Sequence, residues 1–161
     1  MGCTESTEEY HAPQAPPPPP PLYIPGVRYA IRSISSQCFI DGGYSAGQEV
    51  VMKNGDPGAT QSLQWVIQPC DPGFVSIMSV TSGAFLDGRD QHTPECLVTG
   101  RPPQGDQYLN WEIGEADGQI TFRCKSNGFY LDGRAVDGHI AFATNRQPHG
   151  DVYLQWRLEQ L

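Results

Sequence analysis

Three stretches of this chain repeat one pattern without a gap, and they constrain the fold more than any other feature. They span residues 31–65, 77–111 and 122–156. Each contains an Asp-Gly pair, beginning at Asp41, Asp87 or Asp132, and each ends 24 residues later with a tryptophan, at Trp65, Trp111 or Trp156. Repeats of this size contribute one supersecondary unit each to a shared core. The repeats therefore predict one domain with threefold internal symmetry.

Each repeat reads as four short strands. In the first repeat they lie near residues 31–33, 39–40, 50–52 and 63–67, and the other two repeats carry equivalent apolar segments. The second segment ends at Asp-Gly, a turn signal, and no segment shows a sustained helical period. Asp-Gly therefore marks the end of a strand in all three repeats.

Four strands in each of three repeats indicate an all-β chain with a β-trefoil fold, a six-stranded barrel capped by three hairpins. A propeller normally has at least four blades of this size. We expect the domain to cover residues 26–161, with repeats at about 26–71, 72–117 and 118–161. The three tryptophans and the leucines two places before them should form its core, because a barrel interior is filled by large side chains.

Residues 1–25 have a different composition. They contain eight prolines and little aliphatic content, so we expect a disordered tail. The run Pro16–Pro21 should adopt a polyproline II helix. It is either a stiff spacer or a ligand for a polyproline-reading domain.

The first six residues fit the N-myristoylation pattern, with Gly2 as acceptor, Ser6 at the favoured position and Cys3 placed for palmitoylation. They resemble the starts of Src-family kinases and G-protein α subunits, which carry both lipids. One myristoyl chain anchors weakly, and acidic neighbours exclude a polybasic second signal, so Cys3 is the candidate for it. The pattern predicts a cytoplasmic protein anchored to the inner face of a membrane by lipid alone.

Composition excludes several classes. The 10 Lys and Arg residues against 18 Asp and Glu residues argue against nucleic-acid binding. No apolar run is long enough to span a bilayer, and no signal peptide is visible. The five cysteines include no C-x-x-C pair and no zinc-like spacing with histidine, so we expect free thiols and neither a metal nor a cofactor. No catalytic constellation shares a register, so we expect no enzyme.

The pattern Phe-[Ile/Leu]-Asp-Gly, or Tyr-Leu-Asp-Gly, followed by Gln-Trp or Asn-Trp, resembles ricin-B-type β-trefoils over residues 26–161. That resemblance implies the trefoil fold and carbohydrate binding. The chain departs from it in three ways. Leucine stands where the family has a polar residue two places before tryptophan, and the disulfide pairs are absent. Three places before tryptophan, where the family often has a sugar-contacting asparagine, stand Ser62, Tyr108 and Tyr153. Of the family's sugar site, only the aspartate after the second strand carries over.

Repeats two and three contain side chains suited to a sugar, which needs an aromatic face and a few fixed polar groups. Repeat one lacks them, so we expect two sites. The alternatives are that Asp-Gly only makes a turn, that the arginines form surface ion pairs, and that the tyrosines pack in the core. The candidates are Asp87, Arg89, Arg101, Asp106 and Tyr108 in repeat two, and Asp132, Arg134, Asn145, Arg146, Asp151 and Tyr153 in repeat three.

These residues predict a lectin-like module that binds a glycan or a polyol-like ligand. Trefoils also serve other functions, so fold alone does not decide. The main alternative is an intracellular protein-interaction module, such as an actin-binding or scaffold trefoil of the hisactophilin or fascin kind. A protease inhibitor is a weaker alternative, because no loop here is obviously extended.

Overall fold

A computed structural model describes residues 18–89, 95–134 and 136–161. Strands and two short 3-10 turns make up the regular structure of this part of the chain. The strands are β1 Arg28–Ser33, β2 Phe39–Asp41, β3 Val51–Lys53, β4 Gln64–Pro69, β5 Val75–Ser79, β6 Phe85–Asp87, β7 Leu97–Thr99, β8 Trp111–Ala116, β9 Gln119–Cys124, β10 Tyr130–Asp132, β11 Phe142–Thr144 and β12 Trp156–Gln160. The 3-10 turns are η1 Gln61–Leu63 and η2 Val152–Leu154.

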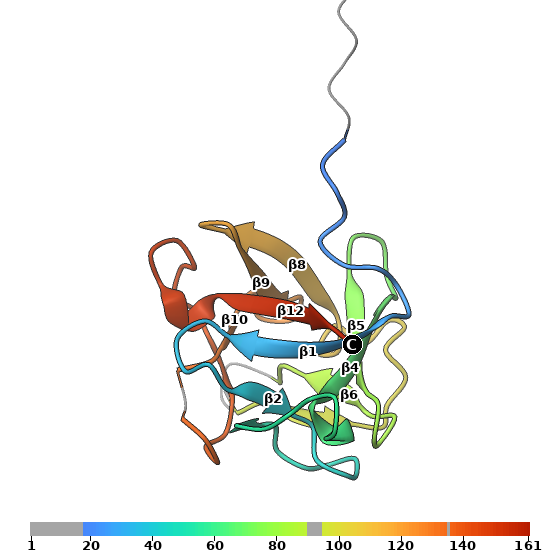
Figure 1. Cartoon of the computed structure of the whole chain (residues 1–161). Coiled ribbons are helices and arrows are strands. Elements are labelled where there is room, and N and C mark those ends of the chain that lie inside the picture. The colour runs from blue at the N-terminus through green and yellow to red at the C-terminus, as the bar shows by residue number, and fades with distance from the viewer. Residues whose placement is uncertain (1–17, 90–94, 135) are drawn as a thin grey trace, which may run out of the picture.

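Six of the strands close into a barrel. Strand β1 pairs with β4, β4 with β5, β5 with β8, β8 with β9, β9 with β12, and β12 again with β1, all antiparallel. Figure 1 shows β1 and β12 side by side across the front of this barrel. Closure leaves no open sheet edge in the ring, so every barrel strand has partners on both sides.

The other six strands form three hairpins, β2–β3, β6–β7 and β10–β11. The residues just before β3, β7 and β11 bond to one another across the pseudo-threefold axis. Val50 N donates to Cys96 O, Cys96 N to Ala141 O, and Ala141 N to Val50 O, at 2.9, 2.9 and 2.8 Å. A six-stranded barrel with three hairpins joined around an axis is a β-trefoil, which confirms the predicted fold class.

This ring of bonds explains a small difference from the predicted strands. The third strands were expected at residues 50–52, 96–98 and 140–142, but they begin at Val51, Leu97 and Phe142. Val50, Cys96 and Ala141, which the expected segments included, pair their backbone groups with the neighbouring repeats instead of with their own hairpins. The apolar pattern was correct, because Val50, Cys96 and Ala141 are all buried.

The core contains the predicted tryptophans and leucines, and all six side chains are fully buried. Each indole Nε1 donates at 3.0 Å to a backbone carbonyl 25 residues earlier, at Ile40, Leu86 or Leu131. Each indole therefore joins its fourth strand to the hairpin of the same repeat. Buried Trp N–H groups need such partners, because an unpaired buried donor is costly.

The glycine of each Asp-Gly pair lies against a core tryptophan. A Cβ atom on Gly133 would stand 2.6 Å from Ser33 Oγ and 2.8 Å from Trp156 Cη2, and one on Gly42 would stand 2.8 Å from Trp65 Cη2. These contacts are closer than packed side chains tolerate. Each of these glycines is buried and makes room for the indole.

The chain enters the barrel through Tyr23. Residues 18–22 run away from the barrel (Figure 1), and Tyr23 packs partly buried against the core. The Tyr29 hydroxyl accepts a hydrogen bond from Ile24 N at 2.8 Å, and Gly26 N donates to Ile67 O at 3.1 Å. Contact with the folded domain thus begins a few residues before position 26.

The described cysteines are all free, as expected. Cys38, Cys96 and Cys124 are buried, whereas Cys70 is only half-buried, at the end of β4. Burial raises the pKa of Cys96 and of Cys124 above the usual thiol value, which keeps both protonated. Among the described residues, no helix is long and apolar enough to cross a membrane.

Candidate functional site

The three aspartates occupy one structural position, the last residue of β2, β6 and β10. All three are buried. In each, Oδ1 accepts the backbone N–H two residues later, from Gly43 at 2.7 Å, Arg89 at 2.8 Å and Arg134 at 2.9 Å. An Asx turn of this kind is how aspartate holds a tight turn. The turn interpretation of Asp-Gly is therefore correct for one carboxylate oxygen in every repeat.

The second carboxylate oxygen differs between repeats. In repeat two, Asp87 Oδ2 accepts from Arg101 Nη2 at 2.8 Å. The other terminal nitrogen of Arg101 lies 3.2 Å from Asp106 Oδ2, and Asp106 Oδ1 accepts from Tyr108 N at 3.1 Å. The guanidinium carbon stands 5.9 Å from the centre of the Tyr108 ring. One arginine thus connects the turn after β6 to the loop before Trp111.

Repeat three builds the same arrangement. Asp132 Oδ2 accepts from Arg146 Nη2 at 2.8 Å, and Arg146 Nη1 lies 2.5 Å from Asp151 Oδ2. Its guanidinium carbon stands 5.5 Å from the centre of the Tyr153 ring. Repeat three also adds Arg134, whose Nη2 and Nε donate to Asp132 Oδ2 at 2.6 and 2.9 Å. Two guanidinium groups therefore share one fully buried carboxylate.

Repeat one lacks this arrangement. Asp41 Oδ2 accepts from the Ser62 hydroxyl at 3.1 Å and pairs with Lys53 Nζ at 2.9 Å. Gly43 and Gly55 stand where the other repeats have their two arginines. Hydrogen bonding to Asp41 raises the pKa of Lys53, so the ammonium stays charged. The sequence difference between repeats is therefore also a difference in structure.

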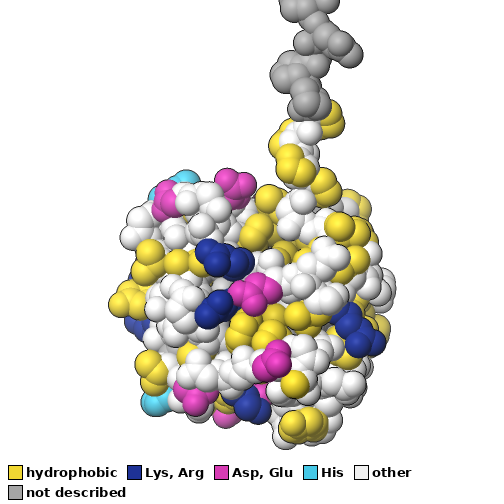
Figure 2. Space-filling view, viewed as in Figure 1, with side chains coloured by type: hydrophobic (Ala, Val, Ile, Leu, Met, Phe, Trp, Pro, Cys, Tyr) yellow, Lys and Arg dark blue, Asp and Glu magenta, His cyan; other side chains and the backbone are white. Residues whose placement is uncertain are grey.

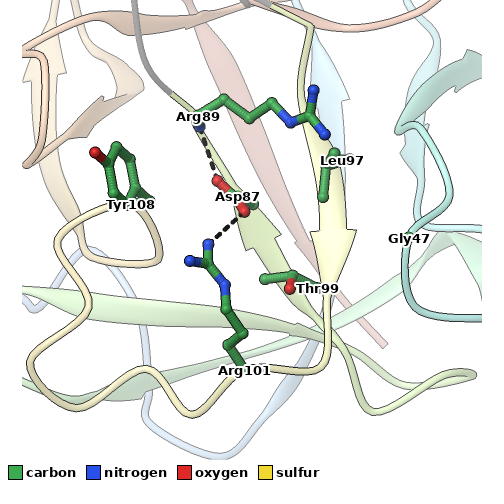
Figure 3. A pocket seen from close by; sticks show the side chains of 7 residues that line it. All are labelled: Gly47, Asp87, Arg89, Leu97, Thr99, Arg101 and Tyr108. Carbon is green, nitrogen blue, oxygen red and sulfur yellow. Dashed lines mark hydrogen bonds and ion pairs between the residues drawn. The ribbon is translucent and has the colours of Figure 1, made fainter.

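A shallow pocket of about 500 Å³ lies over the repeat-two cluster. Figure 3 shows Asp87 between Arg89 and Arg101, with Tyr108 to one side and Gly47 across the opening. Leu97, Thr99 and Gly47 complete the lining, and the sequence did not identify them as site residues. Thr99 could have been predicted from the sequence, because it ends β7 only two residues before Arg101, which was a predicted site residue. Gly47 was not, because it belongs to repeat one and arrives through the hairpin contact around the axis.

Electrostatics in the pocket reflect burial. Desolvation raises the pKa of Asp87, and hydrogen bonds from Arg89 N and the charge of Arg101 oppose that rise. In repeat three, hydrogen bonding to Asp132 raises the pKa of Arg134. Arg134 therefore stays charged, while the carboxylates of Asp87 and Asp132 are buried.

The remaining predicted residues, Tyr108, Tyr153 and Asn145, lie beside these clusters and outside the barrel core. Tyr153 is exposed at 43%, and Tyr108 is half-buried, so neither packs inside the barrel. The core positions beside them are taken by Leu109 and Leu154. Asn145 is exposed next to Arg146, and its side chain has no hydrogen bond to the Asp132 cluster among the described residues. Whether any of these residues contacts a ligand stays a prediction.

Several predictions concern residues outside the described part of the chain. Gly2, Cys3 and the first two prolines of Pro16–Pro21 lie there. The last four prolines of the run are described and exposed. Within residues 18–89, 95–134 and 136–161, no group of three His, Cys, Asp or Glu side chains could hold a metal ion.

No family model and no curated protein sequence matches this chain. Solved structures do. The designed threefold-symmetric protein ThreeFoil aligns with a TM-score of 0.71 at 20% identity over 83% of this chain and 99% of its own. The Macrolepiota procera ricin B-like lectin, solved with lactose, aligns with a TM-score of 0.69 at 13% identity over 86% and 99%.

A Clostridium perfringens endo-β-galactosidase that releases GlcNAcα1-4Gal aligns with a TM-score of 0.72 at 15% identity over 84% of this chain. This chain spans 32% of that enzyme, which is therefore much the longer protein. Identities this low establish the fold alone. The barrel, the three hairpins and these alignments together identify the chain as a β-trefoil similar in fold to ricin B-like lectins.

Proposed function

We propose that this protein binds carbohydrate through repeats two and three, without converting it chemically. The observation that carries the proposal is the pocket over Asp87, where a tyrosine and a fixed arginine stand beside an open hollow. Sugar sites combine an aromatic face for C–H groups with a few oriented polar groups. The lactose complex of a lectin with this fold gives support by analogy.

The arrangement suits a sugar because its polar groups are fixed before a ligand arrives. Arg101 is held at both terminal nitrogens, by Asp87 and by Asp106. Arg146 is held in the same way by Asp132 and Asp151. A side chain that is already ordered loses less conformational entropy on binding. Two such sites on one domain would also raise avidity for a glycan surface, provided both can engage at once.

A glycan array probed with the full-length protein tests the proposal. Saturable binding that falls at least about tenfold in a Tyr108→Ala/Tyr153→Ala double variant is the expected result, since stacked aromatic rings dominate such sites. The matched control is Tyr44→Ala, which removes an exposed tyrosine of repeat one and should bind like the wild type. If no glycan binds, the proposal fails, and a protein-interaction module becomes the better hypothesis.

We further propose that the tail tethers this domain to the inner face of a membrane through lipids on Gly2 and Cys3. The supporting observations are the acylation pattern and the proline run between it and the barrel. A cytoplasmic lectin would meet glycans released or exposed by damage to vesicles. Each proposal has its own test, because none of the described residues that line the pocket belongs to the tail.

A further inference from the structure

We infer that the saccharides bound by repeats two and three carry an anionic group, either a carboxylate or a sulfate ester. This inference rests on the proposed carbohydrate binding. It starts from which charges a ligand would meet. The side chains of Asp87 and Asp132 are 6% and 0% exposed, whereas those of Arg101, Arg134 and Arg146 are 50%, 51% and 34% exposed. The arginines are therefore the most exposed charged groups of each cluster, since the side chains of Asp106 and Asp151 that pair with them are only 18% exposed.

The buried carboxylates have little capacity left for a sugar. Asp132 Oδ2 already accepts three guanidinium N–H groups, and Oδ1 accepts a backbone N–H. Asp87 Oδ1 accepts the backbone N–H of Arg89, and its Oδ2 accepts an N–H of Arg101. A neutral sugar hydroxyl that needed an acceptor here would have to displace an arginine. These aspartates are better described as supports for the arginines than as ligand contacts.

Arg101, in contrast, keeps donors that no residue in the described part of the chain uses. A guanidinium has five N–H groups, and Arg101 uses one terminal nitrogen on Asp87 and the other on Asp106. Each terminal nitrogen has a second N–H, and Nε has one more. The ligand that satisfies such a set must bring acceptors. Carboxylate and sulfate oxygens match the planar fork of guanidinium, and charge-assisted bonds of this kind are about twice as strong as neutral ones.

Each of the two sites places two arginines together. Arg89 and Arg101 both line the pocket of repeat two, and Figure 3 shows them on opposite sides of Asp87. Arg134 and Arg146 meet on Asp132 in repeat three. Arg89 has a left-handed backbone with φ 48°, where repeat one has Gly43 at φ 62°. Such a conformation is unfavourable for a residue with a side chain and is more often found at functional sites.

Repeat one provides an internal control. Its hollow is lined by Asp41, Tyr44 and Glu49 and by no arginine. Lys53 is paired with Asp41 of this repeat. Repeat one therefore differs from repeats two and three in lacking the arginines, while it has the same turn and the same buried aspartate. We expect repeat one not to take an acidic sugar.

Non-specific electrostatic attraction would not explain the binding of an acidic sugar to this protein. The whole chain has a formal net charge of −8. On the face shown in Figure 2, basic and acidic side chains are interspersed over β1 and β12. A protein with this charge repels polyanions at long range. Binding of an acidic sugar would thus have to come from local sites such as these.

Calorimetric titration of the full-length protein with three matched sugars tests the inference. They are galactobiose, digalacturonic acid and a galactobiose sulfated at one hydroxyl, with sodium sulfate as the free anion. We expect at least one acidic sugar to bind about tenfold or more tightly than galactobiose. An Arg89→Gln/Arg134→Gln variant should lose that difference, while Lys53→Gln should keep it. Thermal melting checks that all three proteins are folded.

The possible outcomes separate the two proposals. Preference for the carboxylate or for the sulfate ester supports the inference and says which group is read. Equal or tighter binding of the neutral sugar overturns it and leaves the carbohydrate proposal standing. An unchanged preference in the double-arginine variant overturns the role of these residues. If sodium sulfate binds as tightly as the acidic sugars, the site recognises the anion alone, and the inference that its ligand is a saccharide is wrong. If none of the sugars binds here and no glycan binds on the array, both proposals fail.

Discussion

Replacing Asp132 by asparagine tests whether this aspartate supports the arginines or contacts a ligand. The change keeps the shape of the side chain and one oxygen for the Arg134 backbone N–H. It removes the charge that accepts three guanidinium N–H groups from Arg134 and Arg146. Removing one partner of a buried ion pair costs about 3–5 kcal/mol. Because the two arginines are 51% and 34% exposed and can turn toward water, we expect a smaller loss, about 2 kcal/mol.

Urea denaturation followed by tryptophan fluorescence measures this loss. All three tryptophans are in the core, so their signal reports global unfolding. The matched control is Asp56→Asn, an exposed aspartate that accepts Gly58 N at 2.8 Å and has no arginine partner among the described residues. Substitutions at exposed positions of this kind usually stay within about 0.5 kcal/mol of wild type. A free energy of unfolding for Asp132→Asn that matches the control would refute the support role.

The Asp132→Asn variant also tests whether this aspartate contacts a bound sugar. If Asp132 only supports the arginines, binding should weaken together with stability as Arg146 loses one of its two anchors. If it contacts the sugar directly, binding should vanish while the free energy of unfolding hardly changes. The ratio of the two effects therefore separates the two roles.

Three further predictions concern Gly133, Asp87 and Gly2. Gly133→Ala should lower the free energy of unfolding by about 1–3 kcal/mol through overpacking, whereas Gly100→Ala, where the nearest atom is 3.7 Å away, should change it little in the same urea assay. Asp87 has a pKa raised above 3.8, so the folded protein holds this proton more tightly than the unfolded chain, and its contribution to stability is lost as pH rises above 3.8 through the folded pKa. The stability advantage of wild type over Asp87→Asn should therefore shrink as pH rises through that range in melting curves, and a widening gap would contradict the sign of the shift. Gly2→Ala should abolish incorporation of a myristate analogue in cells, and unchanged labelling would remove the tethering proposal.

Much of the fold could be predicted because symmetry multiplies a weak signal. A single Asp-Gly turn or a single tryptophan says little, but three copies at equal spacing leave few architectures. The starts of the third strands could not be placed exactly from one repeat. They depend on the ring of bonds around the axis, in which Val50, Cys96 and Ala141 each serve the next repeat.

The candidate site was predictable as a set of residues but not as an arrangement. Arg101 and Asp106 could be selected because repeat three carries the same pair at equal spacing. Nothing in the spacing shows that Arg101 bridges two aspartates or that Asp87 is buried beneath it. Burial of a polar group depends on the segments that pack over it, and those come from distant parts of the chain.

The sequence by itself determined the threefold all-β architecture, the identity of the core tryptophans and the difference between repeat one and the other two. Strand periodicity and turn chemistry are local properties, and their repetition in three copies allows them to be recognised in the sequence. Only the tertiary structure decided which oxygen meets which guanidinium, why the glycine after each aspartate has no side chain, and that Gly47 of repeat one borders the pocket of repeat two. These are contacts between segments far apart in the chain, and they exist only once the barrel closes and brings the hairpins together around its axis.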